Sequence, residues 1–294
     1  MSDNEKDQTG KKAALDLGAV WSRGVALLRS NLQLVAILAA VFVLLPNAAL
    51  QFTMPTDADI EGPFSAVMDP TASDAIKEKA VLTLSELMAP FIMLAGVTAV
   101  IAHVGYAGIV ALIGGARPTV GQALSQALRV ILPLVLALII TFVALYVVLA
   151  LVQVMLTPLP PPVAAFLGAI LGLLSAFYLT ARLALTLPVM VIEWELNPLK
   201  ALMRSWRLTG ANPGNVFGFW MLMAVAWFVT MVLQLAVAIL LTSVPGPGPT
   251  ATLIQGLIGG GFSMVWGAIY CAMGVAMHTA LKGQAPEEIA ADFD

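Results

Sequence analysis

The most constraining feature of this sequence is a series of six long apolar runs, most of them joined by short connections. The runs cover approximately residues 32–52, 88–114, 133–156, 163–192, 216–241 and 253–281. A helix rises about 1.5 Å per residue, so about 20 apolar residues cross the roughly 30 Å hydrocarbon core of a bilayer. Sixty per cent of the residues are apolar and only 11% are charged, a balance outside the range of soluble domains. The sequence therefore predicts an all-α membrane protein with a single six-span domain over residues 14–282.

The polar parts of the chain are short. Residues 1–13 are expected to form a disordered polar tail, and residues 283–294 an acidic tail. Residues 53–83 form the long polar connection, whereas 157–162 and 243–252 are proline-rich tight turns. The first long apolar run begins only after Asn31, so we expect no cleavable signal. The single cysteine, Cys271, excludes a disulfide framework, and two distant histidines argue against a metal site, so no cofactor is expected.

Cationic residues indicate how the chain is oriented. If both termini lie inside, twelve of the fourteen Lys and Arg residues fall on the inner side and only Lys77 and Lys79 on the outer side. The inner set is Lys6, Lys11, Lys12, Arg23, Arg29, Arg117, Arg129, Arg182, Lys200, Arg204, Arg207 and Lys282. Such a bias follows the positive-inside rule. It predicts a multi-pass protein of the bacterial inner membrane with both termini in the cytoplasm.

A pseudo-threefold pattern accompanies these spans. Amphipathic segments that would lie at the inner membrane surface precede the odd-numbered spans, at residues 15–30, 119–129 and 197–209. The even-numbered spans each carry a tyrosine among small residues: Tyr106, Tyr178 and Tyr270. Small residues also recur every fourth position in the last span, at Gly259, Ser263, Gly267 and Cys271, which suits close helix contact. We expect three copies of interfacial helix, span, outer turn and span.

The sharpest candidate for a functional residue is Arg182, which lies inside the fourth span. An ionisable group there costs about 2.5–3.5 kcal/mol on insertion scales and usually faces the bundle or a cavity. Arg182 could provide the counter-charge for an anionic substrate or lipid headgroup. The simpler interpretation is an arginine whose guanidinium extends to the inner headgroups.

Glu193 follows Arg182 after eleven residues, about 16 Å along an unbroken helix, which is too far for a direct pair. Its expected partner is Arg204 or Arg207, which would fold the amphipathic segment back against the fourth span. Gating of a lateral opening is the alternative role. Together with Trp206, the cations Lys200, Arg204 and Arg207 could bind anionic lipid headgroups, or they could be a general anchor.

A second candidate site is a polar cavity. His103 lies in the second span near Tyr106, and together with Tyr178 and Arg182 it could line a path for a substrate. A structural histidine that is hydrogen-bonded within the bundle is the simpler interpretation. We find no Ser/His/Asp arrangement, paired carboxylates or phosphate-binding glycine loop, so we expect no enzyme.

The residues around Arg182 carry a family resemblance. Arg182 is followed by Pro188, Glu193 and the run A-L-x-R-S-W-x-L-T-G at residues 201–210. This order resembles the membrane domain attached to some bacterial glycerophosphoryl diester phosphodiesterases, and related stand-alone inner-membrane proteins of unknown role. Five earlier residues also fit the second interfacial helix of that family: Thr119, Val120, Ala123, Leu124 and Pro133. The resemblance would extend from about residue 15 to 282.

The resemblance implies the membrane part without the enzyme. In the fused relatives, the phosphodiesterase chemistry belongs to a separate soluble barrel with His, Glu and Asp at a metal site. Here the long polar segment, residues 53–83, contains no histidine. Our leading hypothesis is a non-enzymatic protein that organises the membrane, lipid headgroups or a protein partner. The alternative is a small transporter or lipid-handling channel that uses Arg182 and His103. The expected partners are the bilayer and anionic headgroups rather than nucleic acid, and a protein partner or homo-oligomer stays open.

Overall fold

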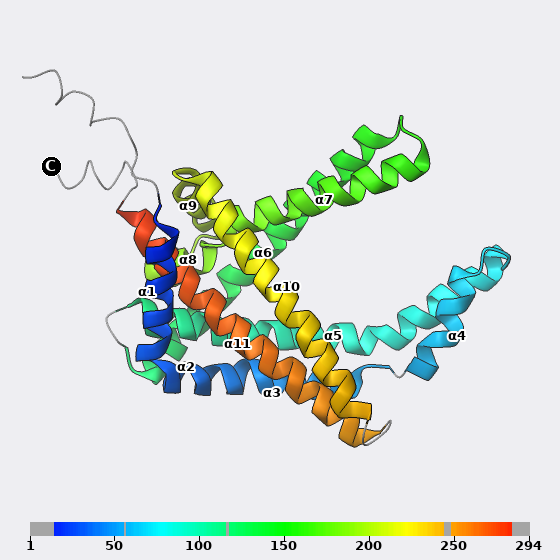
Figure 1. The fold of residues 1–294 in the computed structure, drawn as a ribbon, viewed down its shortest axis with the longest axis horizontal. Coiled ribbons are helices and arrows are strands. Elements are labelled where there is room, and N and C mark those ends of the chain that lie inside the picture. The colour runs from blue at the N-terminus through cyan, green and yellow to red at the C-terminus, as the bar shows by residue number, and fades with distance from the viewer. Residues whose placement is uncertain (1–14, 56, 116–117, 244–247, 284–294) are drawn as a thin grey trace, which may run out of the picture. The chain divides into compact units, whose positions relative to one another are not determined.

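The regular elements in the described part of the chain are all helical. The structure is a computed structural model that describes residues 15–55, 57–115, 118–243 and 248–283. In chain order the elements are α1 (Leu17–Ser30), α2 (Leu32–Ala39), the π-helix η1 (Ala40–Leu44), α3 (Leu45–Leu50), the 3₁₀-helix η2 (Gln51–Thr53), α4 (Asp57–Met68), α5 (Asp74–Gly114), α6 (Val120–Leu156), α7 (Pro161–Leu183), α8 (Thr186–Ile192), α9 (Pro198–Gly210), α10 (Pro213–Ser243) and α11 (Pro249–Lys282) (Figure 1). The tails predicted at 1–13 and, beyond Gly283, at 283–294 lie outside the described residues, as does Arg117.

Six helical stretches are long and apolar enough to cross a membrane. They are Leu32–Thr53, Asp74–Gly114, Val120–Leu156, Pro161–Ile192, Pro213–Ser243 and Pro249–Lys282. Large apolar side chains such as Phe142, Tyr146 and Leu173 are strongly exposed on these stretches. Exposed apolar surface of this kind is what a helix facing lipid requires. The prediction of an all-α membrane protein with six spans is confirmed.

The polar connection at 53–83 contains more regular structure than the sequence suggested. α4 occupies much of it, and α5 begins at Asp74, well before the apolar run at residue 88. Asp74 lies in the first turn of α5, where a carboxylate interacts favourably with the positive end of the helix dipole. The second span is therefore the end of a 41-residue helix whose first part is polar.

The chain divides into two compact units, which we describe separately. Unit 1 consists of residues 1–32, 107–227 and 269–294, and unit 2 of residues 33–106 and 228–268. Unit 1 thus contains α1, the end of α5, all of α6 to α9, the start of α10 and the end of α11. Unit 2 contains the first span, α4, most of α5 and the remaining parts of α10 and α11.

Close backbone contact through glycines organises unit 2. A Cβ atom on Gly256 would lie 2.8 Å from the carbonyl oxygen of Ala48, and one on Gly260 would lie 2.6 Å from that of Leu44. Both glycines lie on α11, and their four-residue spacing places them on one face of the helix. Gly259, which belongs to the predicted ridge, has only the Gln234 amide nearby, at 3.9 Å. Gly267, another member of the predicted ridge, leaves space for the ring of Tyr106 on α5, so the ridge makes close contact there, while the neighbouring face with Gly256 and Gly260 contacts the first span.

Pro46 explains an irregular turn in the first span. Proline has no N–H to donate and its ring crowds the carbonyl four residues earlier, here that of Phe42. The preceding residues form the π-helix η1, a widened turn that accommodates such a defect. The Asn47 amide donates a hydrogen bond to the carbonyl of Val43 at 2.8 Å. The irregularity beside Pro46 is therefore a bulge within a helical stretch.

In unit 1, α6 and α7 form a helical hairpin closed by the proline-rich turn, and they pack along each other (Figure 1). α9 contacts α6, α7 and α8. α1 approaches α11 closely because Gly24 leaves space for the side chain of Met273. The candidate site is thus positioned by helices that come from separate parts of the sequence.

The interfacial segment expected at 119–129 is not a separate helix. It forms the first turns of α6, which runs without a break through Pro133. Thr119 caps the helix as predicted, in a capping box with Gln122. Proline is tolerated inside membrane helices where local adjustments satisfy the freed backbone groups. The segments at α1 and α9 are separate helices, and the threefold repeat stays a prediction.

Candidate functional site

A break in the fourth span creates the candidate site. α7 ends at Leu183 and α8 begins at Thr186. Pro188 causes the break because its ring crowds the carbonyl of Ala184 and it has no N–H to offer that carbonyl. The break consists of Ala184 and Leu185, the two residues between α7 and α8 that lie outside either helix.

Hydroxyl groups bind the carbonyls that this break leaves without helical partners. The carbonyl of Arg182 accepts from Ser205 Oγ at 3.0 Å and from Thr209 Oγ1 at 3.1 Å. The carbonyl of Leu183 accepts from Thr186 Oγ1 at 2.7 Å, and that of Ala184 from the Tyr270 hydroxyl at 3.5 Å. Carbonyls at a helix end need such partners when they are buried. α9 and α11 are thereby joined to the break.

The side chain of Arg182 is buried next to α9. Its exposed fraction is only 7%, and its Cζ lies 4.3 Å from the ring centroid of Trp206. The end of α9 approaches the guanidinium closely, because a Cβ atom on Gly210 would lie 3.2 Å from Nη2. Two guanidinium nitrogens, Nε and Nη1, are buried and have no hydrogen-bond partner among the described residues.

The contacts of the Arg182 guanidinium do not fully offset the free-energy cost of burying its charge. A cation–π contact contributes about 0.5–2 kcal/mol, whereas the desolvation of an ion costs several kcal/mol. Buried donors are almost always paired, and an exception points to a bound water or ion. The unpaired guanidinium nitrogens therefore mark Arg182 as a candidate contact for a water molecule or an anion.

Glu193 forms the centre of a second cluster just beyond α8. Its Oε2 lies 3.2 Å from Arg204 Nε. Arg204 is one of the two partners that the sequence suggested for Glu193. Its Oε1 accepts a hydrogen bond from Nε2 of His278 at 2.8 Å, and that histidine is buried, with 2% exposed. The His278 hydrogen bond and the Arg204 charge lower the pKa of Glu193, while partial burial opposes this shift. The cluster ties α8 to α9 and α11.

Local signals in the sequence explain where α9 begins. The side chain of Asn197 accepts a hydrogen bond from the backbone N–H of Lys200 at 3.1 Å, and Pro198 occupies the first turn. Ala201, Ser205, Leu208 and Thr209 are buried, whereas Lys200 and Arg207 are exposed. Trp206 is 40% exposed and makes an edge contact with Tyr178, with ring centroids 6.1 Å apart.

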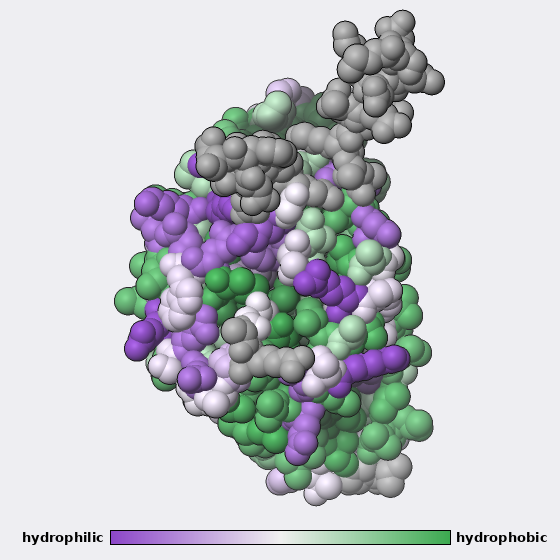
Figure 2. Space-filling model, turned by 90° about the vertical axis from the view of Figure 1, so that its left-hand side faces the viewer, coloured by the Kyte–Doolittle hydropathy of each residue, from purple (hydrophilic) through white to green (hydrophobic). Residues whose placement is uncertain are grey.

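Charge is distributed unequally between the units. The described residues of unit 1 contain eight Lys and Arg and three Asp and Glu, a formal difference of +5 (8 − 3). The described residues of unit 2 contain two Lys and seven Asp and Glu, a difference of −5 (2 − 7). Figure 2 shows hydrophilic residues gathered mainly in the upper part of the view, with hydrophobic residues between and below them.

The second predicted site is not assembled within either unit. His103 and Tyr106 belong to unit 2, whereas Tyr178 and Arg182 belong to unit 1, so the polar cavity stays a prediction. His103 Nδ1 lies 2.7 Å from the carbonyl of Ala99 in its own helix and therefore carries the proton. The ring also makes an edge contact with Tyr106, with centroids 5.7 Å apart. Both contacts lie within α5, and the interpretation of His103 as a structural histidine stays a prediction.

Sequence reasoning missed three groups of this site. His278 was interpreted as an interfacial residue, and the hydroxyls of Ser205 and Thr209 were seen only as parts of a motif. A signal was present for the hydroxyls, since Ser205 and Thr209 are spaced by four residues and lie on one helix face. No comparable signal connects His278 to Glu193, which precedes it by 85 residues.

Fold and site together define a polytopic α-helical membrane protein with a cationic face. Within that class, residues 159–279 match the family described as the membrane domain of glycerophosphoryl diester phosphodiesterase. The resemblance is confirmed over this segment, which is less than half of the chain and contains all residues of both clusters around Arg182 and Glu193. The match is to the membrane domain and not to a catalytic domain. No curated protein and no solved structure matches the chain.

Proposed function

We propose that this protein is a non-enzymatic membrane protein that holds anionic lipid headgroups at the cationic face of unit 1, with Arg182 as the contact for a phosphate. The observation that carries the proposal is the buried guanidinium whose Nε and Nη1 have no partner among the described residues. A guanidinium is planar and always charged, and its donors match the oxygens of a phosphate.

The three carboxylates in the described part of unit 1 have partners other than Arg182. Asp16 caps α1 by accepting from Ala19 N at 3.1 Å, and Glu195 accepts from Asn197 N at 3.0 Å. Glu193 is bound to Arg204 and His278. These are the three carboxylates in the described part of unit 1, so an external anion is the natural counter-charge for Arg182. Lys200 and Arg207 on α9 would add attraction to an anionic surface, at about 1 kcal/mol per residue.

The charge difference between the units supports the predicted orientation. The cationic unit 1 would face the cytoplasm of a bacterial cell, because cations accumulate on the cytoplasmic side of inner-membrane proteins. Exposed Trp194 and Trp206 would then lie at the level of the inner headgroups. A transporter is less well supported, because Arg182 does not line the pocket between α5, α6 and α8.

Native mass spectrometry from lipid nanodiscs tests the proposal. The nanodiscs contain phosphatidylethanolamine with phosphatidylglycerol, and the wild type is compared with Arg182→Leu and with Arg129→Leu. Arg129 is an exposed cation of the same unit, so its replacement controls for the loss of a charge. We expect the wild type and Arg129→Leu to retain phosphatidylglycerol, and Arg182→Leu to lose it about tenfold.

A thermal unfolding curve of each variant accompanies the lipid measurement. Arg182→Lys provides a folded reference that keeps the charge but loses the fork of donors, and we expect intermediate retention. Equal retention of phosphatidylglycerol by the wild type, Arg182→Leu and Arg182→Lys would contradict the proposal. Retention of phosphatidylethanolamine at the same level as phosphatidylglycerol would contradict it as well.

A further inference from the structure

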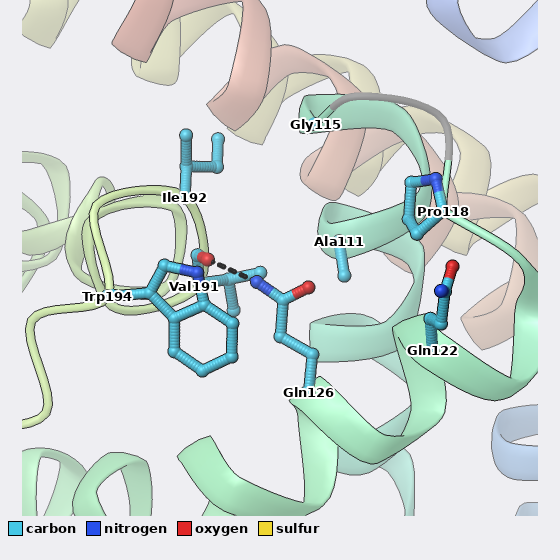
Figure 3. A pocket seen from close by; sticks show the side chains of 8 residues that line it. All are labelled: Ala111, Gly115, Pro118, Gln122, Gln126, Val191, Ile192 and Trp194. Atoms are coloured by element: carbon cyan, nitrogen blue, oxygen red, sulfur yellow. Dashed lines mark hydrogen bonds between the residues drawn. The ribbon is translucent and has the colours of Figure 1, made fainter.

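Unit 1 contains a pocket of about 400 Å³ that the cationic site does not use. Its walls come from the end of α5 (Ala111, Gly115), the start of α6 (Pro118, Gln122, Gln126) and the end of α8 with the residues that follow (Val191, Ile192, Trp194). Figure 3 shows the amide of Gln126 close to Val191 and the indole of Trp194, with Gln122 and Pro118 on the other side of the pocket. The volume lies near the lower end of the range for small-molecule sites, about 300–1,000 Å³.

Trp194 holds its indole at this pocket through a strained backbone. Its φ is +57°. Among the described residues, Trp194 is the non-glycine residue that has a positive φ. For a residue with a bulky side chain this left-handed conformation costs about 1–2 kcal/mol. The neighbours maintain it, because Glu193 is anchored to Arg204 and His278 and α9 begins at Pro198. Strain of this kind persists where the surroundings impose it, and it often occurs at ligand sites.

The hydrogen-bonding groups of the pocket are neutral and only partly used. Gln126 Nε2 donates to the carbonyl of Val191 at 2.7 Å, which leaves the Gln126 carbonyl oxygen as an acceptor. Gln122 Oε1 accepts from Thr119 N at 2.9 Å in the capping box, which leaves the Gln122 Nε2 group as a donor. None of the eight lining residues carries a charge. Among the described residues of this pocket an ion would gain no charged partner, which disfavours an anionic headgroup.

We propose that this pocket binds an uncharged hydroxylated ligand of about monosaccharide size, either a free sugar or the sugar headgroup of a neutral glycolipid. The apolar face of a sugar ring fits against an indole, and its hydroxyls can donate to Gln126 Oε1 and accept from Gln122 Nε2. A volume of about 400 Å³ accommodates one sugar ring. Arg182 and the cations of α9 are not among the lining residues, so this inference stands apart from the anion site.

Trp194→Gly is the decisive variant. It removes the indole and relieves the positive φ, so the protein should fold with an unchanged or higher melting temperature. Gln122→Ala removes the donor while the bond between Gln126 and Val191 remains. Ser125→Ala is the matched control, because Ser125 is exposed on the same turn of α6 and does not line the pocket.

The probes are monoglucosyl diacylglycerol in phosphatidylethanolamine nanodiscs, glucuronosyl diacylglycerol as its charged counterpart, and free D-glucose. We expect the wild type and Ser125→Ala to retain one monoglucosyl lipid by native mass spectrometry, and Trp194→Gly and Gln122→Ala to lose it about tenfold. The glucuronosyl lipid should be retained about tenfold less than the glucosyl lipid. A thermal shift with D-glucose and no lipid retention would assign the free sugar as the ligand.

Three results would overturn the inference. The first is equal retention of monoglucosyl lipid by the wild type, Trp194→Gly and Gln122→Ala. The second is a preference for the glucuronosyl lipid, and the third is neither lipid retention nor a thermal shift. Arg182→Leu is included because it should keep the glucosyl lipid while losing phosphatidylglycerol, so failure of one site is distinguished from failure of the other.

Discussion

The guanidinium of Arg182 lies over the indole of Trp206, with 4.3 Å between Cζ and the ring centroid. This contact gives a physical reason for several residues of the A-L-x-R-S-W-x-L-T-G run. Trp206 covers the cation, Ser205 and Thr209 bind the Arg182 carbonyl, and Gly210 leaves space for Nη2. Several residues of this run thus serve to contact one arginine, Arg182, on the preceding span.

Replacement of Trp206 should expose the cost of burying Arg182. We expect Trp206→Ala to lower the free energy of unfolding by about 1–2 kcal/mol and Trp206→Phe by less, because phenylalanine retains a weaker cation–π contact. The measurement is denaturant or thermal unfolding in detergent micelles. Trp21→Ala is the control, since Trp21 is exposed to a similar extent, 48% against 40%. Equal effects of Trp206→Ala and Trp21→Ala would contradict the prediction.

Gly210 should not gain stability on substitution by alanine, although alanine is the better helix former. Gly→Ala inside a helix stabilises by about 1 kcal/mol where space allows. A Cβ atom on Gly210 would lie 3.2 Å from Arg182 Nη2, whereas one on Gly218 of α10 would meet nothing within 4 Å. We therefore expect Gly218→Ala to raise the melting temperature and Gly210→Ala to leave it unchanged or lower it. A rise for Gly210→Ala as large as that for Gly218→Ala would argue against close packing at Arg182.

The Glu193 cluster should make the protein less stable in acid. The pKa of Glu193 is lowered in the folded protein, so its contribution is complete above the ordinary glutamate pKa of 4.5 and is lost as pH falls through the folded value. Glu193→Gln keeps an acceptor for His278 and Arg204 but cannot titrate. We expect the wild type to be more stable near neutral pH and the two proteins to converge in acid. The melting temperatures of both proteins, measured across this pH range, check the prediction. A difference between them that does not change with pH would show that Glu193 does not cause the loss of stability in acid.

Much of the fold follows from the sequence because hydropathy and helix rise determine where spans can lie. The pairing of Glu193 with Arg204 was also predictable, since few cations are available close to Glu193 in the chain. The contact face of α11 was not, because a four-residue spacing of small residues occurs on more than one face, and only Leu44 and Ala48 select Gly256 and Gly260. The second interfacial segment was misjudged because Pro133 was taken as a helix start, although α6 continues through it.

The site around Arg182 could be predicted only in part. Its charge inside a span marked it as unusual, but the break caused by Pro188 determines where its carbonyl points and which hydroxyls can reach it. His278 was missed because its partner is distant in sequence and nothing local distinguishes it from an interfacial histidine. Contacts of this kind depend on which helix ends come together, and hydropathy carries no information about that.

The two hydroxyls on the Arg182 carbonyl should act as substitutes for each other. Ser205 Oγ lies 3.0 Å from this oxygen, and Thr209 Oγ1 lies 3.1 Å from it and 2.8 Å from the Ser205 carbonyl. A hydroxyl has one proton, so Thr209 can turn to the Arg182 carbonyl when Ser205 is removed. We expect Ser205→Ala and Thr209→Val each to cost less than about 1 kcal/mol in the free energy of unfolding.

The double variant should cost more than the sum of the single variants, because only then is a buried carbonyl left without a partner, at about 1–3 kcal/mol. A double-mutant cycle by denaturant unfolding measures this coupling. Thr180→Val combined with Ser205→Ala is the control cycle, since Thr180 bonds within its own helix to the carbonyl of Ala176 at 2.8 Å. Additive costs for Ser205 and Thr209 would mean that the two hydroxyls do not share the carbonyl. In that case the break at Ala184 would be held by packing alone, and the orientation of Arg182 would have to depend on Trp206 and Gly210.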